Sequence, residues 1–85
     1  MPYEIFWSDE AAKDFSELQK PMQKRIASKL ESITSNPFLF VKHLAGVSAY
    51  SLRVGDYRLI LGIENKKLII LVMKIGHRRR VYNDV

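Results

Sequence analysis

The chain of 85 residues is long enough for one small domain, and 47% of it is hydrophobic, which is too much for a disordered protein. It contains no cysteine, so disulfide bonds and cysteine-ligated metals are excluded, and a reducing cytoplasm is permitted. No apolar run approaches the roughly 20 residues of a membrane span, and no signal-peptide pattern is visible, so we expect a cytoplasmic protein.

The net charge is +5, and its distribution is uneven. Residues 1–47 carry six basic and six acidic side chains, whereas residues 48–85 carry eight basic against three acidic. A basic excess confined to one part of a domain indicates a polyanionic partner. The simpler alternative is an ordinary solubilising surface charge.

The first half of the chain predicts one strand and two helices. Residues 3–7 are aromatic and β-branched, which is typical of a strand. Ser8 fits the N-cap of a helix over residues 9–19, with two acidic residues in its first turn. Pro21 suits the first position of a second helix over residues 21–35. Two consecutive helices of this length form an αα-hairpin.

The second half predicts a loop and three strands. Residues 36–47 form an apolar loop, in which His43 has no second metal ligand nearby and is best interpreted as a surface residue. The strands are expected at residues 48–54, 57–64 and 67–75. The resulting fold class is α+β: a single β-α-α-β-β-β domain over residues 1–85, whose antiparallel-rich four-stranded sheet packs on the αα-hairpin.

A hairpin connects the first two of these strands. Gly55-Asp56 is a strong signal for a two-residue turn, which places Arg53 directly opposite Arg58. Directly opposite side chains share a face, and like charges there destabilise a sheet. We therefore expect this pair to bind an anion, most simply a phosphate.

The sheet should have one face covered by the helices and one left open. A two-residue loop at Asn65-Lys66 places the end of the last strand on the open face, together with Arg53 and Arg58. Because two helices cannot cover both faces, an exposed apolar strip is expected, which favours a protein partner. The expected open face contains Ser51, Arg53, Arg58, Ile60, Gly62, Leu71, Met73, Ile75 and His77.

The basic run that follows the last strand should reach the same region. His77 and Arg78 are expected beside Arg53 and Arg58, and the planar guanidinium group is well suited to phosphate. The sequence shows no cluster of metal ligands, so any phosphodiester chemistry is expected to be metal-independent. RNA carries its own nucleophile, the 2′-OH, and DNA does not, which favours RNA as a substrate.

The order of elements resembles the RelE/ParE toxin superfamily, as do the motifs Leu44-x-Gly46, Tyr50-Ser51-Leu52-Arg53-Val54-Gly55-Asp56-Tyr57-Arg58, Ile75-Gly76-His77-Arg78 and Val81-Tyr82. The resemblance covers almost the whole chain. It implies a RelE-like, microbial-RNase-like fold and a toxin of a type II toxin–antitoxin system. RelE-like members cleave mRNA in the ribosomal A site by attack of the 2′-OH, without a metal or another cofactor. The implied partners are a cognate antitoxin, mRNA and the ribosome.

The resemblance also implies roles for individual residues. The basic catalytic residues of the family are matched by Arg53, Arg58 and Arg78, and its C-terminal tyrosine is matched by Tyr82. His77 stands at a position where some members have a lysine, and other members use a catalytic histidine nearby. Ser51 stands where the best-known RelE sequences have a lysine. The remaining residues of this region are expected to bind RNA, namely Ser51, Lys74, Arg79 and Arg80. Two alternatives stay open: a ParE-like inhibitor of DNA gyrase without catalysis, and a degenerate nucleic-acid-binding relative.

Overall fold

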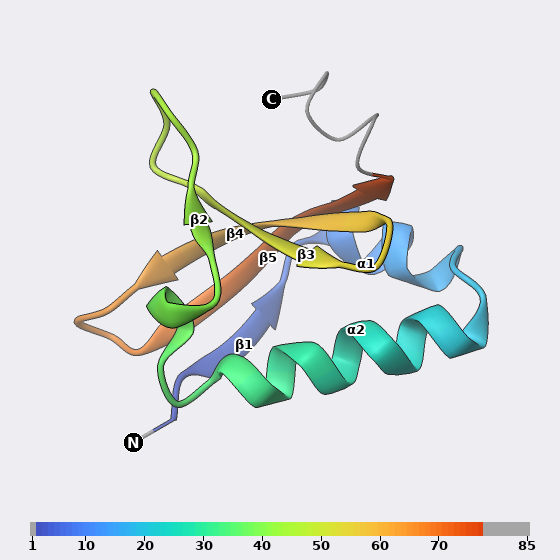
Figure 1. Cartoon of the computed structure of the whole chain (residues 1–85), viewed down its shortest axis with the longest axis horizontal. Coiled ribbons are helices and arrows are strands. Elements are labelled where there is room, and N and C mark those ends of the chain that lie inside the picture. The colour runs from blue at the N-terminus through green and yellow to red at the C-terminus, as the bar shows by residue number, and fades with distance from the viewer. Residues whose placement is uncertain (1, 78–85) are drawn as a thin grey trace.

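The computed structural model describes residues 2–77. Two α-helices, a short 3₁₀ helix and five strands follow one another along the chain (Figure 1). None of the helices in this range is long and apolar enough to cross a membrane. The elements are β1 (Glu4–Trp7), α1 (Asp9–Ser16), α2 (Lys20–Ile33), η1 (Pro37–Leu39), β2 (Lys42–His43), β3 (Tyr50–Val54), β4 (Tyr57–Glu64) and β5 (Ile69–His77).

The five strands form one sheet in the order β1-β5-β4-β3-β2. β1 runs parallel to β5, and all the other neighbours are antiparallel. The expected α+β class is confirmed, but the expectation of four strands was wrong. The fifth strand is β2, which pairs with the start of β3 from within the expected loop. A strand of two residues is too short to show the alternation that predicts a strand.

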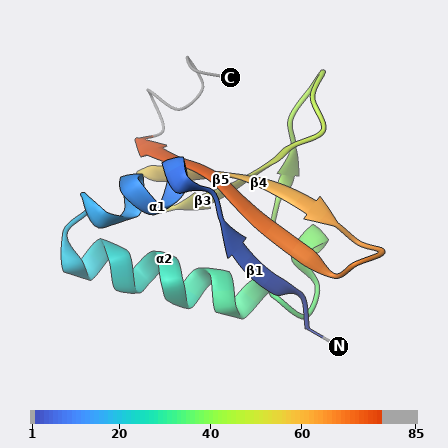
Figure 2. The same ribbon diagram turned by 180° about the vertical axis from the view of Figure 1, so that it is seen from behind.

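Both helices pack on the same face of the sheet (Figures 1 and 2). Each presents one apolar stripe, and the strands present every second side chain, so the two sets interlock in a single core. Tyr57 and Phe15 pack at its margin. The buried core consists of Ala11, Ile26, Leu30, Ile33, Leu52, Val54, Leu59, Leu61, Ile70, Val72 and Ile75.

The predicted hairpin between β3 and β4 is confirmed. Val54 pairs with Tyr57 and Arg53 pairs with Arg58, so the loop is the two residues Gly55-Asp56. Gly55 has φ +61°, whereas Asp56 is not among the residues with positive φ. Positive φ at the first central position alone is the pattern of a type II′ turn, which a glycine accommodates without strain.

The connection between β4 and β5 differs from the expectation. Glu64 pairs with Ile69, so the loop has four residues, 65–68, instead of two. A register shift between Ile60 and Leu61 then leaves one extra residue, Met73, on β5. A bulge of this kind reverses which side chains face which way beyond it.

This bulge corrects the predicted faces of β5. Leu71 lies opposite Gly62 on the open face, as expected. Beyond the bulge, however, Ile75 pairs with Leu59 and is buried in the core. The expectation that Ile75 and His77 share the open face was therefore wrong.

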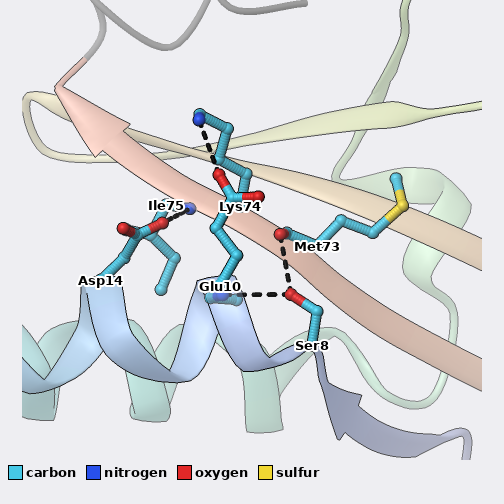
Figure 3. A network of polar contacts seen from close by, with 7 residues as sticks. Ser8, Glu10, Asp14, Met73, Lys74 and Ile75 are labelled. Atoms are coloured by element: carbon cyan, nitrogen blue, oxygen red, sulfur yellow. Dashed lines mark hydrogen bonds and ion pairs between the residues drawn. The ribbon is translucent and has the colours of Figure 1, made fainter.

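Helix α1 takes the place of β1 along the second half of β5 (Figure 3). The Ser8 hydroxyl caps the helix by accepting from the Ala11 N–H at 3.0 Å, and it donates to the Met73 carbonyl at 2.8 Å. The Asp14 carboxylate accepts from the Ile75 N–H at 3.1 Å. The side chains of the N-cap Ser8 and of Asp14 in α1 thus satisfy backbone groups of β5 that β1 is too short to reach.

Replacing Asp14 by alanine should lower the free energy of unfolding by about 1–2 kcal/mol, because the partly buried Ile75 N–H loses its acceptor. Asp14→Asn should retain most of this stability, since an amide oxygen can accept the same hydrogen bond. Urea unfolding measures both, with exposed Glu17→Ala as the control. Equal losses for Asp14→Ala and Glu17→Ala would contradict the assigned role.

Candidate functional site

The face of the sheet opposite the helices carries most of the predicted site residues that the structure describes. We call it the open face. The strand register arranges the residues of this part of the open face in two adjacent rows across the sheet. The first row is Lys42, Ser51, Ile60 and Lys74, and the second is Arg53, Arg58 and Gly76.

Arg58 holds the central place in the second row. It lies on β4, which has a neighbouring strand on each side, and its residue is half-buried. Its partner on β5 is Gly76, which has no side chain to compete for the space beside it. A guanidinium group held in the middle of a sheet is oriented by its surroundings, as a group that recognises a phosphate must be.

Arg53 pairs with Arg58 in the backbone, but its side chain turns toward the hairpin. Its Nε donates to the Gly55 carbonyl oxygen at 3.1 Å, and the residue is exposed. The predicted pairing of two arginines is therefore confirmed in register. This hydrogen bond gives the Arg53 guanidinium a local partner at the turn, which offsets some of the repulsion expected between like charges on neighbouring strands.

Lys74 is engaged with helix α1. Its Nζ lies 2.7 Å from the Glu10 Oε2, with the two side chains 24% and 59% exposed (Figure 3). This ion pair is partly solvated, so it contributes little to stability. It does place a carboxylate beside Lys74, the residue of β5 that the sequence predicts to bind RNA.

Ser51 lies between Lys42 and Ile60 in the first row, and it is only 3% exposed. Its hydroxyl has no hydrogen-bond partner among the described residues 2–77. A buried polar group without a partner costs about 1–3 kcal/mol. The expected direct contact of Ser51 with RNA does not fit this burial, because the hydroxyl is covered.

Replacing Ser51 by alanine should therefore raise the free energy of unfolding, by about 1 kcal/mol, because the uncompensated hydroxyl is removed. The control is Ser48→Ala, which removes an exposed hydroxyl and should change stability by less than about 0.5 kcal/mol. Thermal unfolding of both variants measures the difference. A loss of stability in Ser51→Ala would show that the hydroxyl is satisfied in the native protein.

The other half of the open face is apolar. Phe6 pairs with Leu71 across β1 and β5 and is 46% exposed. Met73 packs beside Ile60 in a small cluster separate from the main core. An apolar strip is thus present on the open face, exposed at Phe6 and half-buried at its other members. We define it by Phe6, Ile69, Leu71 and Met73.

Comparison with known proteins places this geometry in a family. The family model described as the ParE toxin of the type II toxin–antitoxin system parDE matches residues 5–82. The chain belongs to the RelE/ParE superfamily of type II toxins. It is 32% identical over 88 residues to a RelE-like toxin protein of Escherichia coli, covering 98% of this chain and 93% of the relative. It is 25% identical to the mRNA interferase toxin RelE of E. coli K12, covering 99% and 94%.

Solved structures agree in fold. The toxin–antitoxin complex RelBE2 of Mycobacterium tuberculosis contains a chain that aligns with a TM-score of 0.85 at 21% identity, covering 92% of this toxin and 100% of that chain. The archaeal RelE–RelB complex of Pyrococcus horikoshii gives 0.80 at 26% identity, covering 95% and 100%. The predicted RelE-like fold of the toxin is thereby confirmed.

The remaining predicted site residues lie at the end of the toxin. His77 pairs with Tyr57, and the two rings meet edge to face with centroids 5.8 Å apart. His77 is therefore on the helix-covered side of β5 and not beside Arg53 and Arg58, so its expected position was wrong. Arg78, Arg79, Arg80 and Tyr82 lie outside the described residues.

One cation of the open face was missed by the sequence analysis. Lys42 pairs with Ser51, so it extends the first row on the side of β2. Only the short pairing of β2 reveals this position, and no sequence signal predicted that strand. Among residues 2–77, no group of three or more His, Cys, Asp or Glu side chains is arranged to hold a metal ion.

Proposed function

We propose that the toxin cleaves mRNA on the ribosome; its relative RelE of E. coli is named an mRNA interferase toxin. The main support for the proposal is the position of Arg58 on the open face. It lies between Arg53 on β3 and Gly76 on β5, and Gly76 has no side chain. A cation oriented in this way can bind a phosphodiester. The RNA itself supplies the nucleophile.

The proposed reaction is an internal transfer at one phosphodiester. The ribose 2′ oxygen attacks phosphorus, the bond to the 5′ oxygen of the next nucleotide breaks, and a 2′,3′-cyclic phosphate forms. Arg58 stabilises the charge that develops on the phosphoryl oxygens, with Arg78 as its predicted helper. Tyr82 is predicted to move the proton from the 2′-OH or to the leaving 5′ oxygen, because His77, the other residue expected to do so, lies on the helix-covered side of β5.

A ParE-like function is the second candidate, and one observation favours it: the matching family model is that of the ParE toxin. In this alternative the toxin inhibits DNA gyrase, and the basic face serves in binding without catalysis. The mRNA interferase relative and the central position of Arg58 support the first candidate instead.

A cognate antitoxin is the proposed protein partner. The similar structures from M. tuberculosis and P. horikoshii are toxin–antitoxin complexes. The apolar strip supplies a surface for such a partner, since Phe6 is 46% exposed beside Leu71. Burial of this strip would contribute the hydrophobic part of the binding energy.

Induction of the toxin without its antitoxin tests the two candidates against each other. Primer extension on a translated message should show cuts at defined codon positions that disappear when translation is blocked. A reporter of DNA damage should stay silent. DNA damage without cuts in mRNA would support the ParE-like alternative and reject our proposal.

A further inference from the structure

A second basic surface lies around the edge of the sheet from the open face. A groove of about 390 Å³ runs between α2 and the end of β3, next to the hairpin turn. Helix α2 contributes residues one turn apart, and β3 contributes its last residues, which β2 does not cover. The side chains that line it are Arg25, Ser28, Lys29, Ser32, Arg53 and Val54.

The two arginine side chains of the groove, Arg25 and Arg53, both reach the hairpin turn. A Cβ placed on Gly55 would lie 2.9 Å from the Arg25 Nη1, so the Arg25 side chain rests against the turn. The Arg53 Nε donates to the Gly55 carbonyl oxygen at 3.1 Å. The absence of a side chain at Gly55 allows this close approach, which concentrates positive charge at one end of the groove.

The cations that line the groove are not paired with carboxylates in the described part of the protein. Neither Arg25, Lys29 nor Arg53 forms an ion pair with a carboxylate among residues 2–77. Lys29 Nζ lies 5.4 Å from the centre of the Phe40 ring, a contact that leaves its positive charge in place. Three cations around one groove repel one another unless an anion lies between them.

The lining favours a nucleic-acid backbone over a peptide. A helix or strand of a protein partner needs apolar pockets for its anchors, and Val54 is the apolar side chain that lines this groove. Phosphate oxygens need cations and hydrogen-bond donors, and the groove offers two guanidinium groups and an ammonium group. Arg53 also connects the groove with the open face, because its backbone pairs with Arg58.

We propose that this groove binds backbone phosphates of single-stranded RNA. These phosphates belong to the nucleotides next to the RNA segment that lies across the open face. The class of polyanion rests on the proposed function, but Arg25 and Lys29 belong to the groove alone, whereas Arg53 is shared with the open face. In this proposal Arg25 and Lys29 contact no scissile phosphate, so they contribute to affinity and not to the chemical step. Its contacts are to the backbone and are therefore independent of base sequence.

The test compares two double variants of the full chain that remove the same charge from the same helix. Arg25→Gln with Lys29→Gln removes the two groove cations of α2. Lys20→Gln with Lys24→Gln removes two exposed cations of α2 that do not line the groove. The probe is a single-stranded 2′-O-methyl RNA, which cannot be cleaved by 2′-OH attack, so binding is measured whether or not the toxin is a nuclease.

Fluorescence anisotropy at several salt concentrations should show that the groove variant loses two phosphate contacts. Its slope of log K against log salt should fall by about 1.4, which corresponds to roughly 20-fold weaker binding at 0.1 M salt. The control variant should change binding by less than about threefold, because Lys20 and Lys24 do not line the groove and their solvent-exposed charges are screened by salt. Equal losses in the two variants, or no loss in either, would overturn the proposal.

Two further measurements separate the remaining possibilities. If the groove variant lost affinity for a poly-glutamate peptide and kept its affinity for RNA, the groove would be a protein site and the proposal would fail. Single-turnover cleavage of ribosome-bound mRNA at saturating toxin should proceed in the groove variant at the wild-type rate. Absence of cleavage in the wild type would reject the proposed function. The anisotropy measurement with RNA would then decide by itself whether the groove binds RNA.

Discussion

Replacing Arg58 by alanine should abolish growth arrest and reduce the rate of mRNA cleavage by roughly 10²–10³-fold. Arg58 lies at the centre of the open face, paired with Arg53 and Gly76. Removal of a group that stabilises charge in the transition state acts on the chemical step and not on the fold. Single-turnover cleavage of a ribosome-bound message measures the rate constant directly.

Two companion variants make this result interpretable. Arg58→Lys keeps the charge and loses the planar fork, so it should recover only part of the activity. Lys66→Ala removes an exposed cation from the loop between β4 and β5 and should leave cleavage unchanged. Binding of the antitoxin to Arg58→Ala should persist. If this variant arrests growth like the wild type at equal abundance, Arg58 is not part of the site.

The second large effect is expected from Leu59, the neighbour of Arg58 on the opposite face. Leu59 is fully buried between the sheet and the helices. Leu59→Ala should lower the free energy of unfolding by about 4 kcal/mol, since the transfer energy is lost and a cavity is left. Small domains have a total stability of only about 5–15 kcal/mol, so this variant should be close to unfolding at physiological temperature.

Ile60 provides the matched comparison. It is 4% exposed but packs in the small cluster on the open face with Ala49, Leu44 and Met73. Ile60→Ala should therefore cost less, about 2 kcal/mol, since fewer neighbours surround it. Urea unfolding of both variants measures the difference. A larger loss for Ile60→Ala would mean that the open face, and not the helix-covered face, holds the main core.

The sequence was most informative where a local signal determines the geometry. Gly55-Asp56 predicted a two-residue turn, and that turn alone determines the pairing of Arg53 with Arg58. Ser8 predicted the start of α1, because few side chains can cap a helix. The centre of the candidate site therefore followed from a few residues close together in the chain.

The missed features depend on contacts between distant segments. Leu68 adopts φ +56°, which is uncommon for leucine and lengthens the turn that Asn65-Lys66 suggested. The bulge at Met73 could not be predicted, because Met73 and Ile75 are apolar and fit either face. Lys42 joins the open face only because β2 pairs with β3. The bulge places His77 on the helix-covered side instead of the open face, and the pairing of β2 with β3 places Lys42 on the open face.

The chemistry of the ends of the cleaved message tests the central proposal most directly. Purified toxin, ribosomes and a defined mRNA should together give an upstream fragment ending in a 2′,3′-cyclic phosphate and a downstream fragment beginning with a 5′-OH. The same mRNA without ribosomes should stay intact, and Arg58→Ala should give neither fragment. An intact message on wild-type toxin-treated ribosomes, accompanied by inhibition of DNA gyrase in a supercoiling assay, would contradict the account.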